Sequence, residues 1–430
     1  MNICMVTNTY LPHVGGVANS VAIFCQDLKA RGHNLLVIAP EFDATNEKNN
    51  ARKEEEIDVL RLPAIQNFNG SDFSVRLPVP FVVDQAVNDF QPDIIHSHHP
   101  YLLGDTALRA AKQYRLPLIF THHTLYEHYA HYVSGESDLM KQFVKHLSTE
   151  YANLCDHVIA PSGSVHQLIK KRGVKRPVSE IPTGVDCRLF EYGNGRDYRR
   201  QHGITENTLV VGHVGRLAPE KNMSYLAEAV IRFLERTTVS VFLCVGGGAA
   251  ENEIKQYFED QKMSDRLIMP GKQTGTTLVD AYHAMDVFVF SSHSETQGMV
   301  LTEAMAAGKP VIALDASGVR EVVRDQYNGC LLPADSPPEI FATALEDFFR
   351  SSEKTATWSA NARETAARFD RNRCAEKLLE VYAETIETVN HRDPLIDHDS
   401  SALDEVVQRI KAEWELASNK VISLIQAVRE

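Results

Sequence analysis

The sequence predicts two successive doubly wound α/β domains followed by a separate C-terminal helix, and three observations lead to this prediction. The chain has 430 residues, whereas a single domain usually has roughly 100–200. Short apolar, β-branched runs alternate with longer helix-like stretches, as in parallel sheets built from βαβ units. The alternation restarts after residue 208, so the second half of the chain is expected to form a second sheet.

Five runs in the first half of the chain are predicted to form strands. They are ICMVTN, NLLVIAP, DIIHSH, LPLIFTHH and HVIAPS. The second half repeats the pattern with LVVGHVGRL, VSVFLCVGGG, RLIMPG, DVFVFSS and PVIALD. Because open α/β sheets bind ligands outside the carboxyl ends of their strands, the polar segments that follow these runs are where binding residues are expected.

The domain boundaries follow from the same pattern. We expect an N-terminal domain over residues 1–190 and a second domain over residues 205–370, with a cleft between them. The interdomain linker is placed near residues 191–208, because this segment is polar, charged and rich in glycine.

Composition predicts a soluble, cytoplasmic protein. Hydrophobic residues make up 43% of the chain and charged residues 23%, as in globular proteins with a packed core. No apolar run reaches the roughly 20 residues that span a bilayer, and the N-terminus lacks the basic segment of a signal peptide. The seven cysteines are scattered without a Cys-x-x-Cys pair, which suits thiols in a reducing compartment.

Charge argues against one class of partner. The net charge of −13 gives no global positive field that would attract phosphate backbones, so we expect no nucleic acid as a partner. The one clearly basic segment is KKRGVKR at residues 170–176, which could meet an anionic membrane surface or could simply be a solvated face.

Residues 400–430 are predicted to form an amphipathic helix. Apolar residues recur there at alternating spacings of four and three, which produces a heptad-like seam. The seam consists of Leu403, Val407, Ile410, Trp414, Ala417, Val421, Leu424 and Val428. Such a helix can pair with a second copy, pack on its own domain or lie on a membrane. Its mixture of acidic and basic residues favours packing or a homodimer.

The most informative segment is residues 291–310, where a predicted strand leads into a polar loop and then a helix. Glu295 and Glu303 stand eight positions apart, with Gly298 between them. A glycine lets backbone amides approach a ligand, and a helix N-terminus attracts anions, so two carboxylates here could bind the hydroxyl groups of a sugar nucleotide. Alternatively, both glutamates are solvated residues that the helix dipole favours.

Two cations follow the predicted strand LVVGHV. Arg216 and Lys221 could converge on one site from the loop and the helix after it. Breaking a sugar–phosphate bond puts negative charge on the leaving oxygens, which preorganised cations stabilise. Considered alone, an ordinary basic pair on a surface loop is the safer interpretation of the two residues.

Glycines follow two other predicted strands. Gly15 and Gly16 lie at a helix start, which suits close approach to phosphate, although the loop lacks the GxGxxG fingerprint of dinucleotide binding. Gly246 and Gly247 lie in a triplet that could line the same cleft. A tight turn without a ligand is the alternative for each pair.

Histidines cluster at the ends of two predicted strands. They are His96, His98, His99, His122 and His123. Such a cluster suggests a metal site, but no Asp, Glu or Cys set at metal-ligand spacing accompanies it. We therefore expect no obligatory metal, and some of these residues could be satisfied core histidines.

Taken together, these motifs resemble those of family 4 glycosyltransferases. The spacing of Glu295 and Glu303 matches the E-x7-E signature of that family, and GRLAPEKN at residues 215–222 matches its R-x4-K pair. The similarity extends to about residue 388. It implies the GT-B fold, in which two Rossmann-like domains face each other across a cleft and a helix at about residues 372–390 completes the first. It also implies a retaining hexosyltransferase that uses a nucleotide diphosphate sugar and needs no cofactor.

The resemblance also implies roles for individual residues. Glu295 would contact the donor sugar near its reacting carbon, and Glu303 would bind the ribose of the nucleotide. The residues expected to act in catalysis are His123, Arg216, Lys221 and Glu295. Those expected to bind the donor are Gly15, Gly16, Gly246, Gly247, Gly298, Met299, Val300 and Glu303.

Two segments are similar to the branch of the family that glycosylates diacylglycerol and related lipids. One is ETQG at residues 295–298, where many members have EGFG, and the other is THHTLYEHY at residues 121–129. In that branch His123 would contact the donor sugar, while Tyr126, Glu127 and Tyr129 would lie toward the acceptor. The sequence thus favours transfer of a hexose such as glucose from a UDP-sugar to a lipid, with soluble sugar, polysaccharide or protein acceptors as alternatives.

Other functions are weaker alternatives. A non-catalytic sugar-nucleotide-binding protein is disfavoured because a decayed site should have lost some of the glutamates and cations of these motifs. A sugar-nucleotide epimerase would release no glycosylated product, and a phosphorylase would require pyridoxal phosphate.

Overall fold

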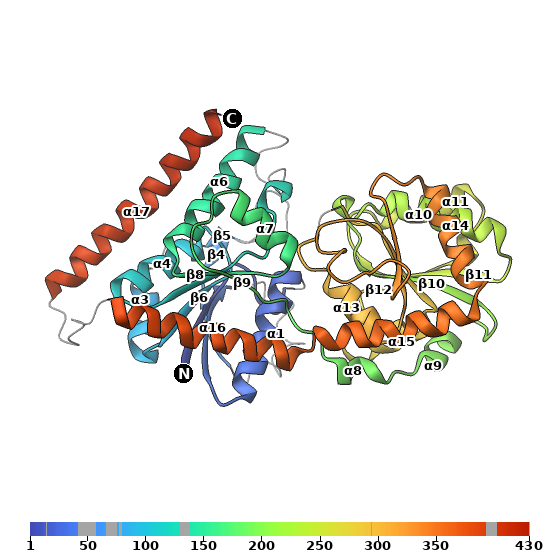
Figure 1. Ribbon diagram of the computed structural model, residues 1–430, viewed down its shortest axis with the longest axis horizontal. Coiled ribbons are helices and arrows are strands. Elements are labelled where there is room, and N and C mark those ends of the chain that lie inside the picture. The colour runs from blue at the N-terminus through green and yellow to red at the C-terminus, as the bar shows by residue number, and fades with distance from the viewer. Residues whose placement is uncertain are drawn as a thin grey trace. The chain divides into compact units, whose positions relative to one another are not determined.

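The computed structural model describes residues 1–13, 15–41, 57–65, 75–76, 80–129, 138–293, 295–392 and 402–429. The chain divides into two compact units: unit 1 is Met1–Thr183 with Cys374–Glu430, and unit 2 is Gly184–Arg373. Each unit contains one large parallel sheet with helices on both faces (Figure 1). The predicted class of two doubly wound, Rossmann-like domains is confirmed.

Unit 1 is built on a seven-stranded parallel sheet in the order β3-β2-β1-β6-β7-β8-β9. The strands are β1 (Asn2–Val6), β2 (Asn34–Pro40), β3 (Asp58–Leu62), β6 (Ile94–Ser97), β7 (Leu118–Thr121), β8 (His157–Ala160) and β9 (Val178–Glu180). A separate antiparallel pair consists of β4 (Ala64–Ile65) and β5 (Val75–Arg76). Alternate residues of β1 enter opposite cores, Ile3 and Met5 on one face and Cys4 and Val6 on the other. Burial on both faces explains why the strands read as nearly continuous apolar runs.

The helices of unit 1 include one that follows unit 2 in the sequence. They are α1 (Gly16–Ala30), α3 (Pro80–Phe90), α4 (Leu103–Gln113), η3 (Tyr126–Tyr129), α6 (Asp138–Leu154), α7 (Gly163–Lys171), α16 (Arg371–Arg392) and α17 (Ala402–Arg429). From Cys374 onward α16 lies along the sheet and α1, where Leu378 and Tyr382 are buried in the same core as Val21 and Phe24 (Figure 1). The core of unit 1 therefore includes side chains from both ends of the sequence.

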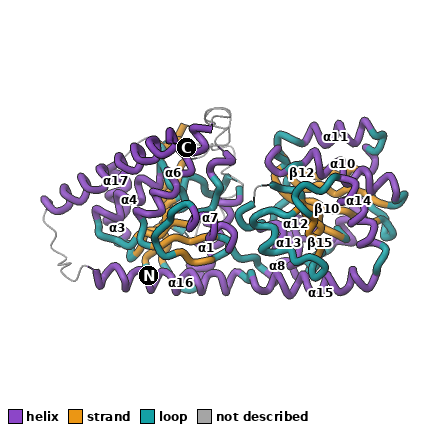
Figure 2. The backbone as a smooth tube through the Cα atoms, turned by 45° about the horizontal axis from the view of Figure 1, so that its top comes forward, coloured by secondary structure: helices purple, strands orange, loops and turns teal. Residues whose placement is uncertain are grey.

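Unit 2 is built on a six-stranded parallel sheet in the order β12-β11-β10-β13-β14-β15 (Figure 2). The strands are β10 (Leu209–Arg216), β11 (Ser240–Gly247), β12 (Leu267–Gly271), β13 (Val287–Phe290), β14 (Val311–Leu314) and β15 (Gly329–Leu332). The larger helices are α10 (Met223–Arg236), α11 (Glu251–Asp260), α12 (Gly275–Ala284), α13 (Met299–Ala306), α14 (Pro338–Phe349) and α15 (Ser352–Arg368). The shorter helices are α8 (Cys187–Glu191), α9 (Gly195–Gln201), η4 (Pro219–Lys221) and η5 (Ser264–Arg266).

The boundary between the units falls after residue 183, before the linker expected at residues 191–208. That segment instead carries α9, which packs within unit 2. Tyr198 is buried, and the Arg199 guanidinium donates to the Ala284 carbonyl oxygen at 2.8 Å. A Cβ at Gly195 would come within 2.4 Å of the backbone of α12. The composition was misleading because a short helix on the surface of a domain is as polar and glycine-rich as a linker.

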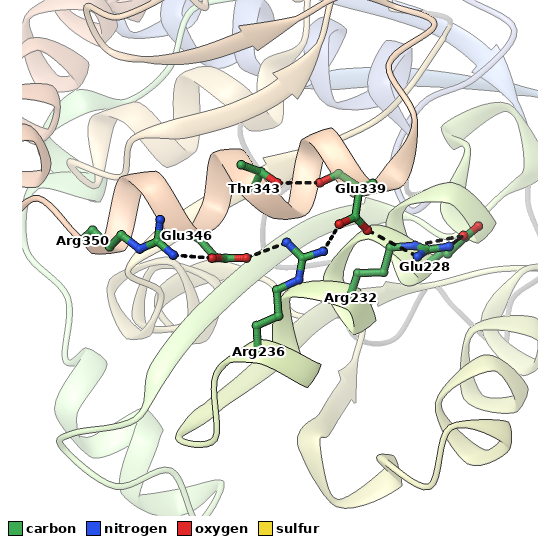
Figure 3. Close-up of polar contacts among 7 residues, drawn as sticks. All are labelled: Glu228, Arg232, Arg236, Glu339, Thr343, Glu346 and Arg350. Carbon is green, nitrogen blue, oxygen red and sulfur yellow. Dashed lines mark hydrogen bonds and ion pairs between the residues drawn. The ribbon is translucent and has the colours of Figure 1, made fainter.

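Ion pairs on the surface of unit 2 join α10 to α14 (Figure 3). Arg236 pairs with Glu339 and also with Glu346, the latter at 2.7 Å. Arg232 reaches Glu339 at 3.4 Å, and Arg350, the residue after α14, reaches Glu346 at 2.7 Å. Since exposed pairs are screened by water, this network supplements the apolar contact between the two helices rather than replacing it.

α17 packs against α4 and α6 of unit 1 (Figures 1 and 2). Only one face of the helix makes this contact. The packed face consists of small or polar residues around one leucine: Ala412, Leu416, Asn419, Ser423 and Ala427. Ion pairs also fix the helix to α4, and they join Asp105 to Lys420, Lys112 to Glu415 and Arg109 to Glu413.

The heptad seam predicted from the sequence lies on the opposite, exposed face of α17. Exposed fractions are 64% for Ile410, 74% for Trp414, 56% for Val421 and 50% for Leu424. Of the other seam residues, Leu403, Val407 and Val428 have side chains that lie outside the described residues. The helix thus packs on its own domain, but not through its most apolar face, because small side chains and ion pairs select the face toward α4 and α6.

Among the helices that the structure describes, none combines the length and the apolar character that crossing a membrane requires.

Candidate functional site

The loops that follow β10 and β13 lie side by side in unit 2, because these two parallel strands are neighbours in the sheet. Ser291, just after β13, donates from its hydroxyl to the carbonyl oxygens of Lys221 at 3.1 Å and Asn222 at 3.0 Å. Asn222 has φ 56°, a left-handed conformation that turns the chain from η4 into α10. Two segments that lie 70 residues apart in the chain are therefore held together at the carboxyl edge of the sheet.

Lys221 and Glu295 form an ion pair across these two loops. The Lys221 ammonium donates to the Glu295 carboxylate, and the two side chains are only 17% and 15% exposed. Partial burial strengthens the attraction, but it also leaves either partner poorly solvated if the other is removed. The structure thus brings together two of the predicted catalytic residues.

Arg216 ends β10 on the same side of the sheet but is differently engaged. It pairs with Glu220 four residues further on, and the two side chains are 45% and 11% exposed. The guanidinium is thus half open to solvent and remains approachable by an anion. Glu220 could not be selected from the sequence, because the i, i+4 rule for ion pairs holds on a helix and Arg216 ends a strand.

Backbone geometry shapes the loop that carries Glu295. Gly298 adopts φ +75°, which favours glycine, and α13 begins directly after it. The amides of Met299 and Val300 are the first of this helix and so have no intrahelical acceptor. Gly318 was not selected from the sequence. Its amide donates to the Glu295 carbonyl oxygen at 3.0 Å, and a Cβ at this position would lie 2.5 Å from the backbone of the Glu295 loop.

Glu303 lies one turn into α13 and is held by a tyrosine from α12. The Tyr282 hydroxyl donates to Glu303 Oε2 at 2.7 Å. Burial raises the pKa of the Glu303 carboxyl to about 7, and the hydrogen bond from Tyr282 opposes that rise. The two residues are 21 positions apart in the chain, so no local pattern pointed to Tyr282.

The glycines at the end of β11 have a structural explanation. A Cβ at Gly246 would lie 1.9 Å from the Gly215 carbonyl oxygen, and one at Gly248 would lie 2.3 Å from that of Leu217. At Gly247 only a flexible lysine side chain is near. Two glycines of the triplet are therefore required because the chain approaches itself closely where β10 and β11 end. A role in donor binding stays a prediction.

The glycines after β1 in unit 1 behave differently. Gly15 is the residue before α1, and a Cβ there would meet the His13 ring at 3.0 Å. At Gly16 a Cβ would meet none of the described residues within 4 Å. Internal packing therefore does not account for Gly16. Its backbone at the start of a 15-residue helix is open to approach, as a phosphate site requires.

The histidines in and after β6 and after β7 form a connected, buried group in unit 1. His96 hydrogen-bonds the Tyr382 hydroxyl of α16 and the Thr121 hydroxyl, both at 2.6 Å. His98 Nδ1 and His123 Nε2 share a hydrogen bond of 2.9 Å. His123, the predicted catalytic histidine, retains some solvent access, whereas His96 is fully enclosed.

These histidines are neutral. Burial lowers the pKa of His96 and of His99 to about 3, and burial together with neighbouring histidines lowers the pKa of His123 well below its usual range. Within the described residues, no three His, Cys, Asp or Glu side chains are placed to hold a metal ion together. His99 Nδ1 accepts a hydrogen bond of 3.1 Å from the Asn8 backbone amide. This bond ties the loop after β1 to the histidine group.

Two of the residues expected on the acceptor side, Tyr126 and Glu127, lie within the packing of unit 1. Tyr126 is buried between Tyr101 and His122. Glu127 forms a largely buried ion pair with Arg172, at the end of α7. The side chain of Tyr129 lies outside the described residues, and contact of these residues with an acceptor stays a prediction.

The basic segment 170–176 presents less free charge than its sequence suggests. Arg172 is taken up by the pair just described, and Arg176 donates to the Asn153 carbonyl oxygen at 2.8 Å. Lys171 and Lys175 are exposed. They are the cations of this segment best placed to meet an anionic surface.

Comparison with known proteins connects both units to the same class of enzyme. The family profile described as "Glycosyltransferase Family 4" matches residues 14–189, and the one described as "Glycosyl transferases group 1" matches residues 195–365. The alpha-monoglucosyldiacylglycerol synthase of Streptococcus pneumoniae is 28% identical over 77% of this chain and 75% of its own. The GDP-mannose-dependent alpha-mannosyltransferase of Mycobacterium tuberculosis is 30% identical over 77% of this chain and 84% of its own.

Solved structures share the fold. Anabaena Alr3699/HepE in complex with UDP superposes with a TM-score of 0.74 and 22% identity, over 89% of this chain and all of the other. A sucrose-phosphate synthase from Thermosynechococcus elongatus superposes with a TM-score of 0.72 and 19% identity, over 90% of this chain and 99% of the other.

Proposed function

This chain belongs to glycosyltransferase family 4, and from that premise we propose that it moves a hexose from a nucleotide diphosphate sugar to an acceptor hydroxyl with retention of configuration. The single observation that carries this proposal is the partly buried Lys221–Glu295 pair, which joins the segment after β10 to the loop that leads to α13. This arrangement offers positive charge, a carboxylate and free amides within one small region of unit 2.

The cations act on the leaving group. As the bond between the sugar carbon and the diphosphate oxygen breaks, negative charge grows on the phosphate, and Lys221 and Arg216 stabilise it. Because Glu295 already orients the Lys221 ammonium, little reorganisation is needed when the bond breaks. The open amides of Met299 and Val300 offer further donors to the donor substrate.

The acceptor oxygen then forms its bond to the sugar carbon on the face that the phosphate leaves. Its proton passes to the departing phosphate oxygen, so configuration is retained and charge balances. Glu295 contacts the sugar near its reacting carbon, and Glu303 accepts a hydrogen bond from a ribose hydroxyl. The proposal uses no metal ion, since Lys221 and Arg216 supply the positive charge.

The residues of unit 1 are assigned from their own motifs alone. We assign Gly15 and Gly16 to the donor diphosphate and His123 to the donor sugar, as a neutral imidazole that exchanges hydrogen bonds with hydroxyl groups. Tyr126, Glu127 and Tyr129 are assigned to the acceptor side.

The donor and acceptor that we propose are those of similar proteins. Alpha-monoglucosyldiacylglycerol synthases from two organisms are among the relatives, and Alr3699/HepE has been solved with UDP-glucose, which together support a UDP-hexose donor and a lipid acceptor. GDP-mannose is the second candidate donor, because GDP-mannose-dependent relatives reach 30% identity. We place the reaction at the cytoplasmic face of a membrane, with Lys171 and Lys175 toward anionic headgroups.

The test is release of the nucleoside diphosphate from a panel of UDP- and GDP-sugars, with and without diacylglycerol vesicles. Release should require the vesicles, resist a metal chelator and disappear in Lys221→Ala and Glu295→Ala. Lys255→Ala is the matched control, since Lys255 forms an exposed pair with Glu251 on α11. Release stimulated only by soluble sugars would replace the lipid acceptor. Unchanged release in Lys221→Ala would overturn the site assignment.

A further inference from the structure

The outward face of α17 is an apolar surface with no partner in the described part of the chain. Besides the four exposed seam residues, Ile422 and Ile425 of the same helix are 43% and 45% exposed. Leu139 at the start of α6 is 47% exposed beside them. Contiguous apolar surface of this kind is uncommon on a monomer and marks an interaction site.

This face continues into a groove between α17 and α6. The groove has a volume of about 370 Å³ and is lined by Leu139, Met140 and Phe143 on one side and by Lys420, Val421 and Leu424 on the other. Its wall is almost wholly apolar, with Lys420 drawn aside toward Asp105 at 2.7 Å. A helix laid on the seam would therefore also cover the side chains of α6.

The seam is complementary to itself in one arrangement. In an antiparallel copy related by a twofold axis that passes between Glu415 and Leu416, Trp414 faces Ala417 of the second copy. The largest side chain of the seam thus meets the smallest, as close packing of facing layers requires. The same register sets Ile410 of one copy opposite Val421 of the other, so two branched apolar side chains meet in the next layer.

The charges beside the seam fit the same register. Glu413 of one copy lies on the flank next to Lys420 of the other. Each already pairs with α4 of its own chain, but the two side chains remain 59% and 48% exposed and can share a second partner. Opposite charges at such flanking positions set partner and orientation in paired helices.

A bilayer fits this face less well. The acidic residues of α17 are Asp404, Glu405, Glu413 and Glu415, and its basic residues are Arg409, Lys411, Lys420 and Arg429. These charges balance, whereas helices that lie on membranes are enriched in lysine and arginine.

We propose that the outward face of α17 binds a second copy of this chain, as an antiparallel pair of α17 helices in which the N-terminal half of each helix covers the α6–α17 groove of the other. The inference is independent of the proposed activity, because no residue of the Lys221–Glu295 region takes part. The twofold arrangement makes the contact isologous, so it closes at a dimer.

The experiment measures the mass of the full chain in solution by light scattering and by sedimentation. The protein concentration is varied from nanomolar to high micromolar. We expect a dimer of the 48.1 kDa chain. Ala417→Trp places two tryptophans in each central layer and should weaken association at least about tenfold. The double variant Trp414→Ala/Ala417→Trp exchanges large and small in every layer and should restore it.

Ala383→Trp is the matched control, because Ala383 is an exposed alanine on a different helix of unit 1, and it should leave the dimer intact. Circular dichroism checks that each variant is folded. A monomer at every concentration overturns the proposal, and so does a dimer that Ala417→Trp leaves unchanged. A monomer that binds phosphatidylglycerol vesicles through Trp414 also overturns it and reassigns the face to a bilayer.

Discussion

In the partly buried Lys221–Glu295 pair, the charge of each side chain is stabilised by the other. Replacing Lys221 by methionine removes a cation from the leaving phosphate and leaves the Glu295 carboxylate partly buried without a partner. We expect kcat to fall by about 10²–10³, the usual effect of losing one donor that stabilises transition-state charge.

Glu295→Gln keeps a polar side chain near Lys221 and is expected to lower kcat as well. Removing both charges should cost less than the two single losses combined, because each single variant already disrupts the same pair. Steady-state kinetics of the two single variants and the double variant measure this coupling. Strictly additive losses would show that the pair does not act as a unit.

Glu303 should make donor binding depend on pH. Its carboxyl has a pKa of about 7, so the carboxylate that accepts a ribose hydroxyl forms as the pH rises through 7. The KM for the nucleotide sugar is therefore expected to fall between pH 6 and pH 8.

Tyr282→Phe tests the cause of this pH dependence. The hydrogen bond from Tyr282 lowers the pKa of Glu303, so its removal should move the midpoint of the KM profile to higher pH. Glu303→Gln should flatten the profile. A profile with the same midpoint in Tyr282→Phe would exclude Glu303 as the titrating group.

At the scale of elements, ion pairs hold α10 to α14, and salt should weaken them (Figure 3). Arg236→Met removes two pairs that cross between the helices, whereas Arg350→Met removes pairs within α14 alone. We expect the first variant to lower Tm more than the second, and the difference to shrink in concentrated NaCl. Thermal unfolding at low and high salt measures it, and a difference that salt leaves untouched would point to lost packing instead.

At the scale of the whole molecule, unit 1 depends on a helix that the chain reaches only after completing unit 2. A chain that stops at residue 372 lacks Leu378 and Tyr382, which are buried in the core beside α1. We expect it to lose the folded state of unit 1, whereas a chain that stops at residue 400 should keep it. Solubility and circular dichroism distinguish them, and a folded unit 1 in the shorter chain would contradict the prediction.

Acid should destabilise unit 1 through its buried histidines. The unfolded chain binds their protons near pH 6.5, but the folded values for His96 and His99 lie at about 3. The stability from these groups is therefore complete above pH 6.5 and is lost as the pH falls toward 3, by about 1.4 kcal/mol per pH unit for each histidine. Urea unfolding between pH 7.5 and pH 5 measures the slope.

His99→Asn is the matched variant for this prediction. The side-chain oxygen of asparagine can still accept the hydrogen bond that the Asn8 amide donates to His99 Nδ1. Asparagine has no titrating ring. Its unfolding should depend less steeply on pH than that of the natural chain. An equal slope would show that His99 does not contribute.

The strands and the two-domain class could be predicted because both depend on local pattern. A strand such as β13 is apolar along its whole length since the parallel sheet buries both of its faces. Glu295, Glu303, Arg216 and Lys221 could be selected because each lies in a short motif. Their roles in catalysis stay predictions, and the pairing of Lys221 with Glu295 was not visible in either motif.

By itself, the sequence determined the order of the strands along the chain, the periodic helix at the C-terminus and the loops that carry charge. Only the tertiary structure decided which distant groups meet, as Tyr282 meets Glu303 and Tyr382 meets His96. It also decided which face of α17 is buried. Periodicity measures how apolar a face is, whereas the choice of face depends on the surface it meets, and α4 and α6 favour small side chains and opposite charges over the apolar seam.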